Sequence, residues 1–195
     1  MNFLSLDLEL NNAPDNTTPN PKIIEVGVSI GDLELSDDTF KVFHWYLDPR
    51  EPIYPNITEL TGITDEDISN RAVSHETCAQ ELSDLIAEHK CFVNPVTWGG
   101  GDSVALLKEF RDRGITFNHF GRRWIDVKTY HVMRSIAIGG SYKGGLSSVM
   151  GRYRLPFKGT PHRAHIDAFN TLRLFKLLVN RHNTLDTTTS GWSVK

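Results

Sequence analysis

The first ten residues place leucines and acidic residues at alternating positions. Residues 3–10 read Phe-Leu-Ser-Leu-Asp-Leu-Glu-Leu. Because side chains along a β-strand point alternately to opposite faces, this pattern predicts a strand with its leucines on one buried face. Asp7 and Glu9 then share the other face, roughly 6–7 Å apart, which is twice the rise per residue of a strand. A fold built on this strand has to cover the leucines and leave two carboxylates side by side.

The rest of the chain alternates between predicted strands and helices. Runs of β-branched and aromatic residues predict further strands at residues 23–30, 40–47, 92–98 and 124–127. Helical spacing predicts helices that begin at Ser74 and that span residues 103–113, 128–138, 146–153 and 164–181. Between them the chain is interrupted by Pro49, Pro52 and Pro55, and Thr64 or Ser69 is expected to cap a short helical turn. We therefore predict an α/β fold with a central mixed five-stranded sheet flanked by helices.

At 195 residues, the chain is long enough for one domain with a substantial core. We expect this domain to span residues 1–183 and a flexible polar tail to span residues 184–195. The N-terminus lacks a basic segment followed by a long apolar run, so neither a signal peptide nor a membrane span is predicted. Two cysteines, Cys78 and Cys91, are too few for a disulfide framework and favour a reducing, cytoplasmic location. A homo-oligomer is compatible with the sequence.

The two halves of the chain differ in charge. Residues 1–100 contain 5 Lys and Arg against 18 Asp and Glu, whereas residues 101–195 contain 16 against 6. A polyanion-binding surface requires such a basic region, and this favours nucleic acid as the partner. The alternative is that the charges segregate by chance, since halves of a sequence need not be halves of a surface.

The next acidic candidate follows three glycines. Residues 98–102 read Trp-Gly-Gly-Gly-Asp at a predicted junction between a strand and a helix. Because α/β folds place many sites at the carboxyl ends of strands, Asp102 is a candidate site residue. The alternatives are a helix N-cap for Asp102 and a plain turn for the glycines. The loop is not of the Walker A type, since no Gly-Lys-Ser/Thr follows.

His162 and Asp167 lie five residues apart near the C-terminus. Thr160 and Pro161 are typical of a helix start, so His162 is expected on a loop or loose first turn and Asp167 on the helix. His162 is then a candidate general base, and His165 is its rival. A zinc pair of His162 and His165 is conceivable, but several gathered carboxylates favour Mg²⁺ or Mn²⁺.

The clusters occur in the order Asp-x-Glu, Asp, and His-x4-Asp. This order resembles the DEDDh branch of the DnaQ-like (RNase T) exonuclease superfamily, whose fold is RNase H-like, over roughly residues 3–182. Residues 23–27, Ile-Ile-Glu-Val-Gly, resemble the family's second strand, and residues 60–64, Leu-Thr-Gly-Ile-Thr, resemble its nucleotide-contacting loop. The sister branch has a tyrosine where this chain has Arg163, and is thereby excluded. The short single domain and the approach at residues 159–162 are most similar to ERI-type 3′ exoribonucleases.

The resemblance implies a two-metal-ion 3′→5′ exonuclease. Its metal ligands, for two Mg²⁺ or Mn²⁺ ions, would be Asp7, Glu9, Asp102 and Asp167. Asp7 would bridge the two ions, and His162 would take a proton from the attacking water. The substrate would be the 3′ end of single-stranded RNA or DNA, with RNA preferred, and the products nucleoside 5′-monophosphates. The expected nucleic-acid contacts are Leu60, Thr61, Gly62, Ile63, Trp98 and Arg163.

Two other functions compete with this interpretation. The same scaffold could hydrolyse short oligonucleotides or small phosphodiesters, or it could bind nucleic acid without catalysis. A catalytically inactive module predicts a broken carboxylate set, whereas the set in this chain is complete. Basic residues at positions 111, 113, 122 and 123 favour a longer polyanion over a small ester.

Several other residues have structural alternatives to a functional role. Glu25 is either a partner of groups around the site or a solvent-facing strand residue. Asp126 is favoured as a helix cap over a fifth metal ligand. Trp98 is more often a core residue than a base-stacking one, and Arg122 and Arg123 are more often a solvated turn than a phosphate contact.

Overall fold

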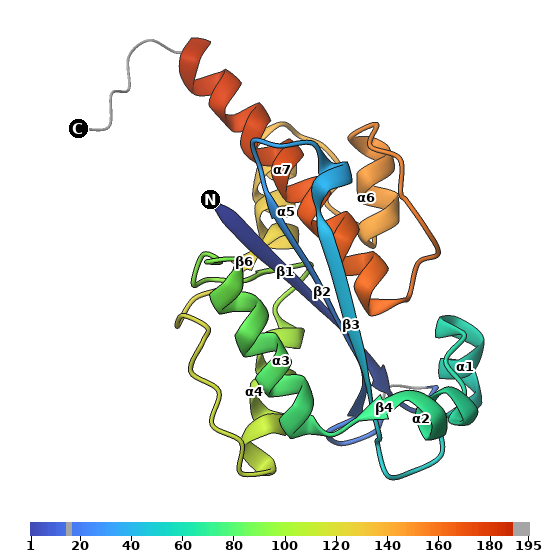
Figure 1. Cartoon of the computed structure of the whole chain (residues 1–195). Helices are drawn as coiled ribbons and strands as arrows, with labels where there is room; N and C mark the ends of the chain where they lie inside the picture. Colours follow the sequence, from blue (N-terminus) through green and yellow to red (C-terminus); the bar gives the residue numbers. More distant parts are fainter. Residues whose placement is uncertain (15–16, 189–195) are drawn as a thin grey trace.

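The computed structural model describes residues 1–14 and 17–188, and it contains a twisted sheet with helices on both faces (Figure 1). The strands are β1 (Asn2–Asn11), β2 (Lys22–Asp32), β3 (Lys41–Leu47), β4 (Ala72–Val73), β5 (Val96–Thr97) and β6 (Ile125–Asp126). Their order in the sheet is β4-β3-β2-β1-β5-β6. β1, β2 and β3 form an antiparallel meander. The three short strands pair in parallel, β4 with β3, β5 with β1, and β6 with β5. The predicted mixed α/β architecture is confirmed.

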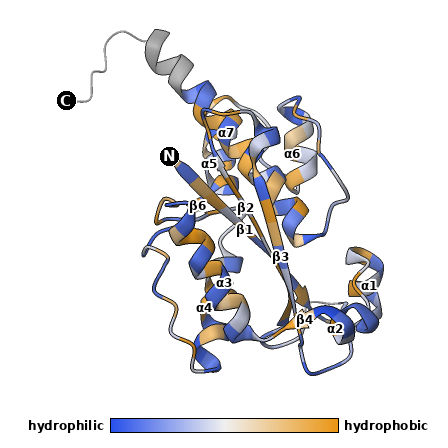
Figure 2. Ribbon diagram, viewed as in Figure 1, coloured by the Kyte–Doolittle hydropathy of each residue, from blue (hydrophilic) through white to orange (hydrophobic). Residues whose placement is uncertain are grey.

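The helices lie on both sides of this sheet. They are α1 (Pro55–Thr61), α2 (Asp65–Arg71), α3 (His75–Glu88), α4 (Gly101–Asp112), α5 (Val127–Ala137), α6 (Leu146–Arg152) and α7 (Ala164–Thr188), with a 3-10 turn η1 (Asp37–Thr39). Hydrophobic and hydrophilic residues alternate along these helices (Figure 2), and apolar residues of α3, α4, α6 and α7 belong to the buried hydrophobic clusters. Within the described part of the chain, no helix has both the length and the apolar composition that crossing a membrane requires.

The two faces of β1 meet different helices. One hydrophobic cluster joins the even-numbered residues of β1 to α3 and α4, and its members include Leu4, Leu6, Leu8, Leu82, Leu106 and Phe110. On the other face, the ring of Phe3 contacts that of Phe175 in α7, with 5.4 Å between the ring centroids. The predicted alternation of β1 is therefore confirmed. It places Asp7 and Glu9 on the face of the sheet that α7 covers.

The sheet has six strands, whereas the sequence predicted five. The additional strand is β4, whose two residues are too few to show an alternating pattern. β5 is only two residues long, although residues 92–98 were predicted to form a strand. Pro95 lies within that run and has no N–H to donate to a neighbouring strand, so strand pairing starts only after it.

The proline-rich segment contains a helix that the sequence did not predict. Pro55 is the first residue of α1, a position where the missing N–H costs the helix nothing. The expected caps are confirmed for the next two helices. Thr64 caps α2 through reciprocal hydrogen bonds with Asp67, and Ser74 caps α3 by accepting a hydrogen bond from the Thr77 N–H.

The last helix is longer than its periodicity predicts. The expected range of residues 164–181 extends to Ala164–Thr188 in α7. Residues 184–188 are therefore helical, although their polar composition suggested the start of a tail. Residues 189–195, the rest of the predicted tail, lie outside the described residues.

The start of α7 lies directly on the sheet at Gly27 of β2. A Cβ atom at this position would lie 2.1 Å from the carbonyl carbon of Ala164 and 2.1 Å from the backbone nitrogen of His165. Real Cβ atoms essentially never approach backbone atoms this closely. The absence of a side chain at Gly27 therefore allows the first turn of α7 to rest against β2.

Gly27→Ala should lower the free energy of unfolding by about 1–3 kcal/mol, the usual cost of forcing an extra methyl group into a packed site. Denaturant titration measures this change. Gly151→Ala is the matched control, because Gly151 lies in α6 and, its own helix backbone and chain neighbours aside, none of the described residues comes within 4 Å of its Cβ position. The control should be neutral or stabilise by up to ~1 kcal/mol. A Gly27→Ala variant as stable as the wild type would contradict the packing described for α7.

Candidate active site

Three of the four carboxylates that the sequence predicted as metal ligands lie together on the face of the sheet that α7 covers. Asp7 and Glu9 of β1 lie opposite Gly27 and Glu25 of β2 in the strand register. Asp167 lies in the first turn of α7, just beyond the point where that helix rests on Gly27. Oxygen atoms of Asp7, Glu9 and Asp167 all lie within 4.8 Å of one another. The structure thus brings together residues that are separated by up to 160 positions in the chain.

Asp102 approaches the same group from the neighbouring strand. β5 pairs with β1 and leads through the glycine loop into α4, whose first turn contains Asp102. After burial, the charge of Asp102 is the largest influence that raises the pKa of Asp7. The N-cap of α4 is Gly100, so the alternative in which Asp102 caps this helix is wrong.

Asp126 supports the glycine loop in front of Asp102. It is the N-cap of α5 and accepts hydrogen bonds from the backbone N–H groups of Lys128 and Thr129. Its Oδ1 atom also accepts a hydrogen bond of 3.0 Å from the N–H of Gly99. Gly99 has a φ of 101°, which glycine adopts without strain. The capping interpretation of Asp126 is confirmed, and the same side chain ties the loop to β6.

All four carboxyl groups have a raised pKa. Burial is the largest cause for each, and neighbouring carboxylates add to it for Asp7 and Glu9. The pKa of Glu9 rises to about 8 and that of Asp102 to about 7. Crowded carboxylates of this kind repel one another and weaken the fold unless a cation compensates their charge.

The donor set fits divalent cations. Carboxylate oxygens are the ligands that Mg²⁺ and Mn²⁺ prefer. The Oδ2 atom of Asp167 accepts a hydrogen bond of 3.2 Å from the N–H of His162. Its Oδ1 atom is buried and has no hydrogen-bond partner among the described residues. Buried polar atoms are normally partnered, and a cation would supply the partner that this oxygen lacks.

His162 lies on the turn that precedes α7. Its side chain is exposed, and its φ of 63° falls in the left-handed region, which is uncommon for a residue other than glycine. Its backbone N–H fixes the turn to Asp167. Burial raises the pKa of Asp167, and the nearby His162 side chain partly opposes that rise, so the two side chains are close enough to interact. The expected position outside the helix is therefore observed.

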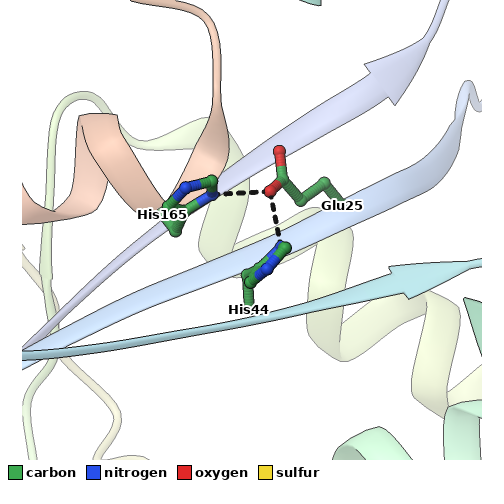
Figure 3. A group of neighbouring side chains, drawn as sticks. All are labelled: Glu25, His44 and His165. Atoms are coloured by element: carbon green, nitrogen blue, oxygen red, sulfur yellow. Dashed lines mark hydrogen bonds and ion pairs between the residues drawn. The ribbon is translucent and has the colours of Figure 1, made fainter. Parts of the chain in front are cut away.

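His165, the rival base, points to Glu25 instead (Figure 3). Its Nδ1 atom lies 2.7 Å from Oε1 of Glu25, and Nδ1 of His44 lies 2.9 Å from the same oxygen. The side chain of Glu25 is fully buried, so it does not face solvent. His44 carried no signal in the sequence, because its place beside Glu25 depends on the register of β3 against β2.

The loop predicted to contact nucleotides lies at the end of α1. Leu60 is 49% exposed and available to a ligand, whereas Thr61 and Ile63 are buried. Gly62 caps the helix with a φ of 72° and a hydrogen bond to the carbonyl of Thr58. The buried residues Thr61 and Ile63 therefore fix the loop to the protein, and Leu60 is the side chain that it exposes to solvent.

The other two predicted nucleic-acid contacts are engaged within the protein. Trp98 is half-buried, and its ring lies near that of His131, with 6.4 Å between centroids. The Arg163 guanidinium donates hydrogen bonds to Glu25 and to the hydroxyl of Tyr46. Contact of either residue with nucleic acid stays a prediction.

A wide depression of about 1670 Å³ lies beside α4. None of the four carboxylates lines it, although Gly101 and Leu10 do. Its lining carries both signs of charge, and Lys108 is paired with Asp112 there at 2.6 Å. The depression therefore lacks the uniformly basic surface that the charge of the C-terminal half suggested.

Comparison with known proteins adds the family. The model of the RNase T exonuclease family matches residues 4–175. Among curated proteins, none shows significant sequence similarity to the chain. The nuclease domain of 3′hExo, a DEDDh family member bound to rAMP, is similar with a TM-score of 0.76 and 16% identity, over 92% of both chains.

Two further solved structures share the fold. A 3′-exonuclease that recognises the 3′ end of histone mRNA stem-loop has a TM-score of 0.78 and 15% identity, over 92% of this chain and 82% of that one. The zinc-bound complex of E. coli exonuclease I with single-stranded DNA has a TM-score of 0.71 and 16% identity, over 94% and 42%. These likenesses confirm the predicted RNase H-like fold. Because the family model covers most of its length, this chain belongs to the RNase T family of exonucleases.

Proposed function

We propose that this exonuclease hydrolyses single-stranded RNA or DNA from the 3′ end, prefers RNA, and releases nucleoside 5′-monophosphates. The observation that carries the proposal is the convergence of four carboxylates from three elements beside an exposed histidine. Asp7 and Glu9 come from β1, Asp102 from α4 and Asp167 from α7, and His162 lies two residues before α7 begins.

We assign the four carboxylates to two divalent cations, Mg²⁺ or Mn²⁺. Asp7 is the candidate shared ligand, because it groups with Glu9 and Asp167 and its pKa also responds strongly to Asp102. The unpartnered Oδ1 atom of Asp167 supports the same assignment. When bound, such cations supply positive charge that stabilises the attacking and leaving oxygens of a phosphodiester displacement.

His162 is the proposed general base. It is exposed and lies outside α7, so water and the end of a strand can both reach it. In the proposed reaction, a water proton passes to the imidazole while the water oxygen bonds to the terminal phosphorus. The bond from phosphorus to the 3′ oxygen of the preceding nucleotide breaks, and that oxygen takes a proton from solvent. The products are one nucleoside 5′-monophosphate and a strand shorter by one nucleotide.

The substrate proposal rests on the relatives and on charge. The similar structures include one with rAMP, one that recognises an mRNA stem-loop and one with single-stranded DNA. The excess of Lys and Arg in residues 101–195 favours a polyanion. Exposed Leu60 offers an apolar contact for a terminal base.

A digestion experiment tests this proposal. Single-stranded RNA and DNA 20-mers of one sequence, labelled at either end, are incubated with Mg²⁺, Mn²⁺ or EDTA. We expect immediate release of 3′ label as mononucleotide, gradual shortening of 5′-labelled strands, faster loss of RNA, and no reaction in EDTA. Early release of 5′ label would contradict the direction. Faster cleavage of a dinucleotide than of the 20-mer would favour the small-phosphodiester alternative, and cleavage of neither would favour an inactive binding module.

We also propose a cytoplasmic location. Its support is the state of the two cysteines, which are both free thiols. Burial raises the pKa of Cys78 to about 12 and that of Cys91 to about 11, so neither is a reactive thiolate near neutral pH.

A further inference from the structure

Glu25 is a fully buried acidic residue that the proposed chemistry does not use. It lies in β2, where the register places it between Glu9 of β1 and Tyr46 of β3. Its side chain is 0% exposed. Burial of a carboxylate is unfavourable unless charged or hydrogen-bonding partners compensate it, so the partners of Glu25 indicate its role.

Most of these partners belong to the start of α7. Arg163 donates from Nε to Oε2 at 3.2 Å and from a terminal nitrogen to Oε1 at 3.3 Å. The backbone N–H of Ala164 donates to Oε2 at 3.0 Å, and His165 lies 2.7 Å from Oε1. Three consecutive residues of one helix end thus bind a single carboxylate of the sheet.

These contacts keep Glu25 ionised. Burial raises its pKa, but the hydrogen bonds from His165, His44 and Arg163 outweigh burial and lower the pKa below its usual range. Figure 3 shows Nδ1 of both histidines directed at Oε1 of Glu25; because an ionised carboxylate only accepts hydrogen bonds, we expect both nitrogens to act as donors. Glu25 therefore differs from Glu9, its neighbour across the strands, whose pKa is raised.

The residues that Glu25 binds, Arg163 to His165, lie between the two proposed catalytic residues His162 and Asp167. His162 immediately precedes Arg163, and Asp167 follows His165 by two residues. Gly27, two residues from Glu25 on the same strand, is where the backbone of α7 rests. Glu25 and Gly27 therefore hold this helix start against β2 by charge and by close packing.

We propose that Glu25 is a positioning residue of the exonuclease site. It fixes the first turn of α7, and thereby sets His162 and Asp167 relative to Asp7 and Glu9, without touching the substrate. This inference rests on the proposed roles of His162 and Asp167. A metal ion bound by Glu25, His44 and His165 is the rival interpretation. The Arg163 guanidinium on the same carboxylate disfavours it, because two positive charges would compete for one acceptor.

Glu25→Gln tests the proposal, because glutamine keeps the shape but cannot accept the same set of charged hydrogen bonds. We expect kcat to fall roughly 10- to 100-fold, the scale expected for a misplaced catalytic group, with KM changed less than about threefold. The matched control is Glu109→Gln. Glu109 is also a buried glutamate bound by a histidine and an arginine, His75 and Arg113, but it lies in α4 away from the start of α7. This control should lower the melting temperature while leaving kcat within about threefold.

A double-mutant cycle shows whether Glu25 acts through the histidine. In a His162→Asn background, Glu25→Gln should cost less than in the wild type, because one of the two groups that it positions is already gone. Equal fold-losses in the two backgrounds, or an equal loss of kcat in Glu109→Gln, would overturn the proposal. Wild-type activity of His162→Asn alone would contradict the proposed base, and the Glu109→Gln comparison would then still decide the role of Glu25.

Metal analysis addresses the rival interpretation. The intact protein is equilibrated with Zn²⁺ or Mn²⁺, and bound metal is counted in the wild type and in His44→Asn. We expect equal numbers, since His44 is not assigned to any ion. Loss of one bound ion in His44→Asn would overturn the positioning proposal and identify the Glu25 group as a metal site.

Discussion

Asp7→Asn is expected to lower kcat at saturating Mg²⁺ by about 10³-fold or more. In the proposed site Asp7 contacts both cations, and each cation contributes several kcal/mol of transition-state stabilisation. Release of 3′ label from single-stranded RNA measures the loss. Asp38→Asn is the control, because Asp38 is an exposed carboxylate of η1 whose ion-pair partner is Lys158. Retention of more than a few per cent of activity in Asp7→Asn would contradict the two-ion assignment.

The same substitution should stabilise the metal-free protein. The pKa of Asp7 in the fold lies well above its ordinary value of 3.8, chiefly because of burial. A carboxyl group whose pKa is raised by folding weakens the fold progressively as the pH rises above its unfolded pKa. In EDTA, Asp7→Asn should therefore raise the melting temperature, and more at pH 8 than at pH 5. A lower melting temperature at both pH values would indicate that Asp7 is needed for folding.

His162→Asn should lower kcat by about 10²- to 10⁴-fold, the usual contribution of a general base. Asparagine is chosen because it tolerates the left-handed φ of 63° at this position, so the turn is preserved while the imidazole is lost. KM should change little. The rising limb that a histidine base gives to the pH–rate profile should disappear.

His165→Asn is the matched control for His162→Asn. His165 binds Glu25 inside the protein, and an asparagine amide can donate a hydrogen bond in its place. Its kcat should fall less than about tenfold, and the rising limb should remain. If His165→Asn were the more damaging change, the base would be misassigned.

Local sequence patterns predicted the parts of the site that lie on single elements. The alternation around Asp7 and Glu9 indicated a strand with both carboxylates on one face. The interval from His162 to Asp167 indicated a base outside a helix and a ligand within it. The positions of these residues on the strand and at the helix end agree with the structure, because each depends only on the geometry of one element, whereas their roles as base and ligand stay predictions.

The expectation that the three separate acidic clusters form one site came from the resemblance to the exonuclease family, and not from the spacing of the residues. No periodicity in the chain states that Asp167 lies beside Asp7, because that contact depends on how α7 packs on the sheet. Gly27 allows the backbone of α7 to approach β2, but this role becomes visible only in the three-dimensional structure. His44 was missed for the same reason, since the register of β3 decides that it meets Glu25.

In the proposed site, divalent cations would relieve the repulsion among the four crowded carboxylates. Burial and the neighbouring carboxylates raise the pKa of Glu9 to about 8, so we expect cation binding near pH 7 to release protons from this cluster. Calorimetric titration of the metal-free protein with Mn²⁺ at pH 7, in two buffers of different ionisation enthalpy, counts both ions and protons. The account predicts two Mn²⁺ per chain and release of about one proton or more, with both reduced in Asp7→Asn. Absence of Mn²⁺ binding, or binding without proton release, would contradict it.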